Sequence, residues 1–152
     1  MKKTGARNVG LFIACAIIGL LGLMVFVRLA PTDPDRWHLE HAGADWAIVP
    51  WDTVSPETGG ARLRVSMAAG DPTDTLARLD SLAMATARTR RIAGSVNEGR
   101  ITWETRSLIW GFPDYTTAEA RPDGVYVHAR LRFGREDMGV NATRLKNWQA
   151  GL

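Results

Sequence analysis

The chain has 152 residues, of which 45% are hydrophobic, and a formal net charge of +3 at pH 7. This length is sufficient for one domain. Four of the 19 basic residues flank an apolar run near the N-terminus, whereas all 16 acidic residues follow it, so the remainder carries a net charge of −1. A domain without excess positive charge binds phosphate backbones poorly, and this excludes nucleic acid as the expected partner.

The apolar run, VGLFIACAIIGLLGLMVFV, extends from Val9 to Val27 without a charged residue. At about 1.5 Å per residue, a helix over this run spans roughly 28 Å, which is close to the hydrocarbon thickness of a bilayer. A helix in a soluble core would show a polar stripe, and the run has none. We therefore expect a transmembrane helix over residues 9–29.

This helix is predicted to stay attached as a signal anchor. Cleavage after Ala30 would place Arg28 at position −3 and Pro31 at +1, and both are unfavourable for a signal peptidase. The residues just before Cys15 suit a lipobox, but the apolar run continues far beyond the cysteine. This favours an unmodified cysteine inside the span. Because it is the only cysteine, no disulfide is expected in the rest of the chain.

The charges that flank the span predict its orientation. Lys2, Lys3 and Arg7 precede it, and Arg28 alone follows it closely. The positive-inside rule then places residues 1–8 in the cytoplasm and the rest of the chain across the inner membrane. The strong preference for arginine over lysine is typical of a G+C-rich bacterial genome, so we expect the domain to lie in a periplasm.

Residues 30–60 are predicted to be a linker, because four prolines and a Gly-Gly pair interrupt any long helix. Two interpretations of its tryptophans remain open. The linker packs against its own domain, or Trp37 lies at the level of the lipid headgroups. His38 and His41 lack the four-residue spacing of a zinc-binding helix, so no metal is expected here.

Residues 61–152 are predicted to form an α+β domain. Residues 61–67 alternate as a strand does, and residues 71–93 read as the main helix. Asp71 can cap this helix, Leu76 and Leu79 begin its apolar stripe, and arginines collect at its C-terminal end, where the helix dipole favours cations. These arginines therefore need no ligand to explain them.

Three further strands are expected over residues 100–110, 114–120 and 125–133, separated by Gly- and Pro-containing turns. A short helix is expected to follow, capped by Asp137 or Asn141 and ending near residue 150. The predicted fold is one antiparallel sheet of about four strands, one main helix and a short C-terminal helix. Alternation within these strands gathers charged side chains on one face, either as a solvated ladder of ion pairs or as a binding surface.

The tail of the chain carries a recognisable signature: Arg132, Gly134, Asp137, Gly139, Val140, Asn141 and Arg144. Together with the turn GFPD (residues 111–114), it resembles domain-of-unknown-function family 1499, which has membrane-anchored members and no established activity. The resemblance covers residues 71–148. In the family the signature begins with an arginine and two serines, where this chain has His128, Ala129 and Leu131. The resemblance implies a domain and implies no reaction.

Two interpretations of the tail follow from its residue types. The first is a structural clasp, in which Gly134 and Gly139 permit unusual backbone angles, Asp137 and Asn141 start the helix, and Arg132 reaches Asp137. The second is an anion or partner site made by a set of basic residues: His128, Arg130, Arg132, Arg135 and Arg144.

No catalytic constellation is recognisable, because the chain has three histidines and no Gly-x-Ser-x-Gly elbow. No cofactor is implied. We expect a single-pass inner-membrane protein whose periplasmic domain is an interaction or accessory module for a membrane or envelope complex. The alternative is a periplasmic lipid- or small-molecule-binding domain, with a cavity between the sheet and the helix over residues 71–93.

Overall fold

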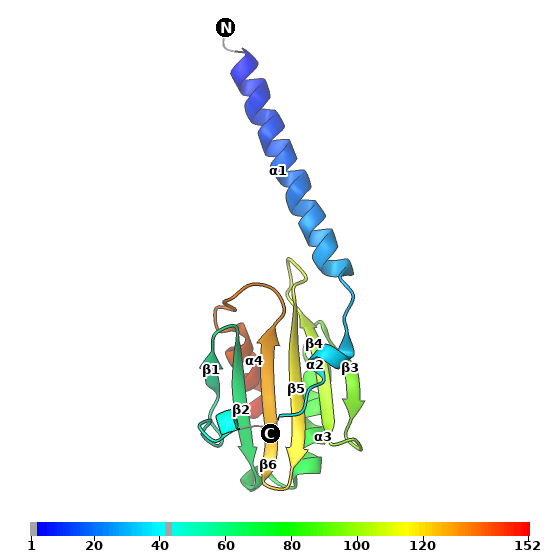
Figure 1. Cartoon of the computed structure of the whole chain (residues 1–152), viewed down its shortest axis with the longest axis vertical. Helices are drawn as coiled ribbons and strands as arrows, with labels where there is room; N and C mark the ends of the chain where they lie inside the picture. Colours follow the sequence, from blue (N-terminus) through cyan, green and yellow to red (C-terminus); the bar gives the residue numbers. More distant parts are fainter. Residues whose placement is uncertain (1–2, 42–43) are drawn as a thin grey trace.

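The structure is a computed structural model and describes residues 3–41 and 44–152. A long helix, α1 (Lys3–Leu29), extends from one end of a domain built around a single sheet (Figure 1). Its segment Asn8–Leu29 is long and apolar enough to cross a membrane, with a mean hydropathy of 2.8. Its apolar side chains are exposed almost to the last turn, so no other part of the described chain covers them.

The sheet has six antiparallel strands, in the order β1-β2-β6-β5-β4-β3. Their bounds are β1 (Ser55–Glu57), β2 (Gly60–Ser66), β3 (Thr89–Ser95), β4 (Arg100–Arg106), β5 (Pro113–Arg121) and β6 (Gly124–Leu131). The α+β class and the antiparallel sheet are confirmed, but the expected count of about four strands is wrong. The two strands that were missed, β1 and β3, form the two edges of the sheet.

The missed strand β3 lies where the sequence predicted the end of the main helix. That helix, α3 (Pro72–Ala85), is capped by Asp71 as expected, with Asp71 Oδ1 accepting from the Thr73 amide at 2.8 Å. It stops at Ala85 because Thr86 is extended and Arg88 takes a φ of 60°, which reverses the chain. The arginine-rich stretch then pairs with β4.

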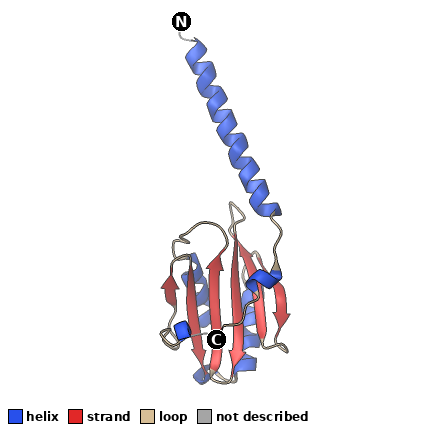
Figure 2. Cartoon of the chain, in the orientation of Figure 1, coloured by secondary structure: helices blue, strands red, loops and turns tan. Residues whose placement is uncertain are grey.

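The helices α3 and α4 (Val140–Gln149) cover one face of the sheet, and the main core lies between them and the sheet (Figure 2). The helix α4 is the expected short C-terminal helix. Leu76, Leu79 and Trp103 are fully buried here, and Trp103 meets Trp148 edge-to-face at 5.6 Å between ring centroids. This close packing counts against a ligand cavity between the sheet and α3.

The other face of the sheet carries the expected ladder of polar side chains, but it is not solvated. Residues 30–41 and 44–51 run across it and include α2 (Pro34–Trp37) and a 3₁₀ turn, η1 (Ala44–Trp46), visible in front of the sheet in Figure 1. We call residues 30–41 and 44–51 the covering segment. Its Trp37 stacks on Tyr115 of β5 at 4.1 Å between centroids, instead of facing a headgroup. Beneath it, Thr102, Glu104 and Thr117 have no exposed surface.

His41 joins the covering segment to β5. Its amide donates to Glu119 Oε2 at 2.6 Å, and its Nε2 lies 3.1 Å from the Thr117 carbonyl oxygen, to which a neutral ring can donate. Burial lowers the pKa of His41 to about 3, although the Thr117 carbonyl favours the charged form. His41 is therefore buried as a neutral imidazole.

Replacing Trp37 with alanine should detach much of the covering segment. We expect Trp37→Ala to lower the free energy of unfolding by about 3 kcal/mol, the usual scale for removing a buried tryptophan. Trp37→Phe keeps an aromatic ring on Tyr115 and should lose much less. Chemical denaturation of the full chain in detergent, with hydrogen exchange of residues 30–51, measures both. Equal stability of the two variants would contradict this account.

The neutral His41 predicts an acid-labile fold. Below its unfolded pKa of 6.5, the unfolded chain binds a proton that the folded chain excludes until about pH 3, so stability is lost as the pH falls through this window. Between pH 7.5 and 5.5 the loss from this residue should be about 1.4 kcal/mol. His41→Gln should remove that part of the slope in urea titrations at the two pH values. An unchanged slope would mean that His41 is not the group responsible.

Candidate functional site

Three of the basic residues predicted to form a site converge on one open groove. His128 and Arg130 extend from β6, Arg135 follows in the next loop, and Trp37 and Glu57 complete the walls. The groove has a volume of about 400 Å³. We call it the β6 groove. It exists because the alternation of β6 directs His128 and Arg130 toward the face that the covering segment crosses.

His128 and Glu57 form a pair in the wall of this groove, with Nε2 and Oε1 2.5 Å apart. Burial lowers the pKa of His128, and the neighbouring Glu57 only partly opposes this. Burial raises the pKa of Glu57, but the hydrogen bond from His128 and the charges of Arg62 and Arg130 outweigh it and hold that pKa below its ordinary value. The pair therefore consists of a carboxylate and a neutral imidazole that donates to it.

Arg130 is used mainly for contacts within the protein. Its Nη2 donates to the Trp37 carbonyl at 2.8 Å and to Thr117 Oγ1 at 3.0 Å, and its guanidinium lies 5.4 Å from the centroid of the Trp37 ring. Burial lowers its pKa. Arg130 thus holds the covering segment against the sheet, and only the remainder of its guanidinium is available to the β6 groove.

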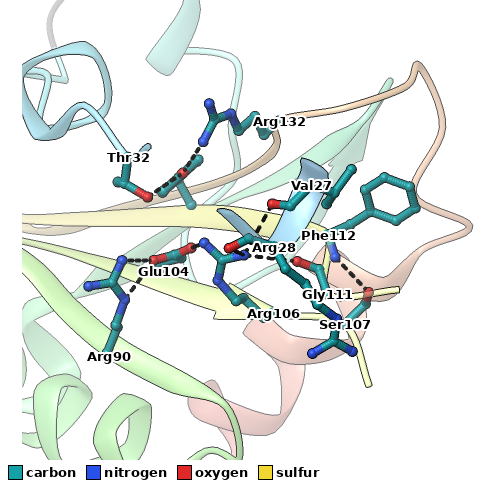
Figure 3. Close-up of polar contacts among 11 residues, drawn as sticks. Val27, Arg28, Thr32, Arg90, Glu104, Arg106, Ser107, Gly111, Phe112 and Arg132 are labelled. Atoms are coloured by element: carbon teal, nitrogen blue, oxygen red, sulfur yellow. Dashed lines mark hydrogen bonds and ion pairs between the residues drawn. The ribbon is translucent and has the colours of Figure 1, made fainter. Parts of the chain in front are cut away.

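Arg132 is also used internally and lies outside the β6 groove. Its Nη1 donates to the hydroxyl of Tyr115 at 3.2 Å, and that hydroxyl lies 3.2 Å from Thr32 Oγ1 (Figure 3). The expected contact between Arg132 and Asp137 is therefore wrong. Arg132 instead supports the first residues after α1 through the Tyr115 hydroxyl. Arg135 differs from both, because it is exposed at the rim of the β6 groove and forms no salt bridge within the described residues.

The glycine-containing tail forms a structural clasp by a different route from the one expected. Asp137 accepts from the amides of Gly139 at 3.1 Å and Asn141 at 2.9 Å, so Asp137 organises the start of α4. Gly139 has a φ of +77° there, and Gly134 earlier in the loop has +96°. The N-cap position itself is held by Gly139, so neither Asp137 nor Asn141 stands at the expected cap, and Asp137 acts from two residues before it.

Arg144 of α4 completes this clasp and lies away from the β6 groove. It donates to Asn141 Oδ1 at 2.7 Å and to Asp114 Oδ2 at 3.2 Å, so it ties α4 to the start of β5. Burial raises the pKa of Asp114, although the charge of Arg144 opposes this. The two halves of the sequence signature, GFPD and the tail, are thus joined by one ion pair.

A second site, which sequence reasoning missed, lies where α1 meets the sheet. It is a pocket of about 330 Å³ lined mainly by arginines around one carboxylate. We call it the junction pocket; its charged lining residues are Arg28, Arg88, Arg90, Glu104 and Arg106. The sequence assigned Arg88 and Arg90 to a helix end, and this interpretation fails because both lie beyond α3.

Glu104 is the centre of this arrangement. Its carboxylate is fully buried and forms ion pairs with Arg90 on β3 and with Arg106 at 2.5 Å (Figure 3). Arg106 also lies 3.4 Å from the carbonyl oxygens of Val27 and Arg28 and 3.2 Å from that of Gly111. The sequence offered only a slight indication of this cluster of charges, namely that Glu104 and Arg106 share one face of a strand.

Comparison with known proteins supports the resemblance seen in the sequence. No curated protein and no solved structure matches the chain. The profile of a family described as "Protein of unknown function (DUF1499)" matches residues 30–152, which include the covering segment, the sheet and both packed helices. Since this match extends over most of the chain, the protein belongs to the DUF1499 family.

Proposed function

We propose that this chain is a single-pass inner-membrane protein, with residues 1–8 in the cytoplasm and the family domain in the periplasm. The domain would serve as an interaction or accessory module for a membrane or envelope complex. The observation that carries this proposal is α1, whose apolar surface is uncovered and which continues into the domain within a few residues. The basic residues before the span and the near-neutral domain after it support this orientation.

The sheet itself is poorly suited to pairing with a partner's strand. At one edge β1 has only three residues and contains Pro56, and at the other β3 is interrupted by a register shift between Arg91 and Ala93. Short edge strands, prolines and bulges discourage strand addition. A partner would therefore bind through side chains on the surface of the domain.

The β6 groove is the surface that best fits such a partner. Arg130 and Arg135 supply guanidinium donors, and the small exposed part of the Trp37 ring borders them. Arginine is among the residue types that contribute most to protein interfaces. Arg130 and Arg135 carry two positive charges against the single carboxylate of Glu57, so the lining of the groove has a net positive charge, which favours an acidic segment of the partner.

The alternative of a lipid- or small-molecule-binding domain is favoured by one observation, the junction pocket. Its lining combines four arginines with one exposed apolar side chain, that of Leu108 in the β4–β5 hairpin. It lies on a different part of the domain from the β6 groove, so the two proposals do not compete for the same residues.

Topology is the first test. A C-terminal alkaline phosphatase fusion should be active and a C-terminal green fluorescent protein fusion exported by the same route should be dark, because phosphatase needs the oxidising periplasm for its disulfides. Alkaline carbonate should leave the chain in the membrane. Release of the protein by carbonate would overturn the proposed arrangement. So would an inactive phosphatase fusion together with a fluorescent green fluorescent protein fusion.

The β6 groove is tested by reversing a charge that the fold does not use. In mild-detergent pull-downs of the full chain, Arg135→Glu should reduce the recovery of a stoichiometric partner at least fivefold, a loss on the scale of about 1 kcal/mol. Arg78→Glu, at an exposed arginine of α3, is the matched control and should not reduce it. Equal recovery with both variants would remove the groove from the proposal.

A further inference from the structure

We propose that the end of the domain nearest α1 rests on the bilayer and that the junction pocket binds the phosphate of an anionic phospholipid headgroup. This inference rests on the proposed membrane insertion of α1. It concerns residues that the β6 groove does not include. Three features carry it: the depth at which one hairpin is held, the apolar side chains at its tip, and the arginines behind it.

The depth of the β4–β5 hairpin is fixed by its contacts with the last turn of α1. Arg28 Nη2 donates to the Ile109 carbonyl at 2.9 Å, and Arg106 reaches back to the carbonyl of Val27. Val27 is only 2% exposed, unlike most of the span before it. A Cβ on Gly111 would lie 2.8 Å from Cγ of Arg28, so the two chains approach closely. The hairpin tip therefore lies level with the last residues of the apolar run, which in a spanning helix is the interface.

The tip itself is apolar and uncovered. Leu108 is 70% exposed and Ile109 is 67% exposed. Trp110 lies behind them, its ring 6.5 Å from that of Phe112. Aromatic rings at this level are typical of the membrane interface. The tip thus has the composition of a segment that enters a bilayer surface.

The loop before α4 reaches the same end of the domain, as Figure 1 shows. It carries Met138, which is 96% exposed, and leads into Val140, the first residue of α4, which is 53% exposed. Val140 lines a hollow together with Ser107, Phe112 and other residues of both loops, which places the two loops side by side. The hairpin tip and this loop together would therefore give the domain two neighbouring apolar contacts with the membrane.

The junction pocket lies directly behind the tip and shares Leu108 in its lining. Its lining contains four arginines and one carboxylate, and that carboxylate, Glu104, is already paired with two of them. Arg28 and Arg88 each donate to a main-chain carbonyl, and each guanidinium retains further N–H donors. Guanidinium groups bind phosphate oxygens through parallel hydrogen bonds. Basic pockets at this level attract anionic lipid headgroups.

The first measurement is lipid retention by the full chain in detergent, followed by native mass spectrometry with added phosphatidylglycerol or phosphatidylcholine. We expect at least fivefold higher occupancy by phosphatidylglycerol, and loss of that preference in the double variant Arg28→Gln, Arg88→Gln. Arg78→Gln is the matched control and should keep it. Equal occupancy by the two lipids would overturn the assignment to an anionic headgroup, because both lipids carry a phosphate. An unchanged preference in the double variant would overturn the assignment to the junction pocket. Displacement of the lipid by millimolar inorganic phosphate would overturn the assignment to a lipid, because the site would then not need a lipid.

The second measurement does not depend on the arginine variants. An environment-sensitive fluorophore on Leu108→Cys, in a Cys15→Ser background in lipid nanodiscs, should be quenched by nitroxide-bearing lipids. The same label on Ile48→Cys, a comparably exposed position on the covering segment, should not be. Equal quenching at the two positions in carbonate-resistant protein would overturn only this inference. Release of the protein by carbonate would overturn the proposed membrane insertion as well.

Discussion

A buried negative charge determines how the domain is joined to α1. Glu104 is fully enclosed in the middle of the polar face, where a lone carboxylate would be strongly destabilising, so it requires arginines on both sides. One of these, Arg106, extends its remaining donors to main-chain oxygens of α1 and of the β4–β5 hairpin. The ion pair that stabilises the sheet is therefore also the contact that positions the helix.

The polar face shows how a surface that looks solvated in sequence becomes an interior. The covering segment brings Trp37 and His41 onto it, and the hydroxyls and carboxylates beneath find their partners there. Thr117, for example, donates to the Trp37 carbonyl at 2.8 Å and lies 3.0 Å from Thr102 Oγ1. The sheet is thus buried on both faces, by helices on one and by a largely irregular segment on the other. This explains why the family match begins at residue 30, before the first strand.

Local patterns were predictable from the sequence and long-range partners were not. The Asp71 cap, the alternation of β6 and the hydrogen bonds of Asp137 to the first turn of α4 each depend on a few neighbouring residues, and all are present. The stretch before Gly94 read as helix because its alanines and arginines suit one, but pairing with β4 stabilises it as a strand. Arg132 donates to Tyr115 rather than to Asp137. Which of the two acceptors lies beside Arg132 is decided by the tertiary structure and not by the spacing of the residues along the chain. The junction pocket collects residues from α1, β3 and β4, so no spacing along the chain could reveal it.

The short connection after α1 has a mechanical consequence. Only residues 30–33 separate α1 from α2, and the neighbouring hairpin is hydrogen-bonded to the last turn of α1. A long flexible linker would let the domain move and rotate freely relative to α1. This short connection instead restricts both the position and the orientation of the domain relative to α1. A rotation of α1 about its own axis would therefore turn the domain, and with it the β6 groove, in the same direction.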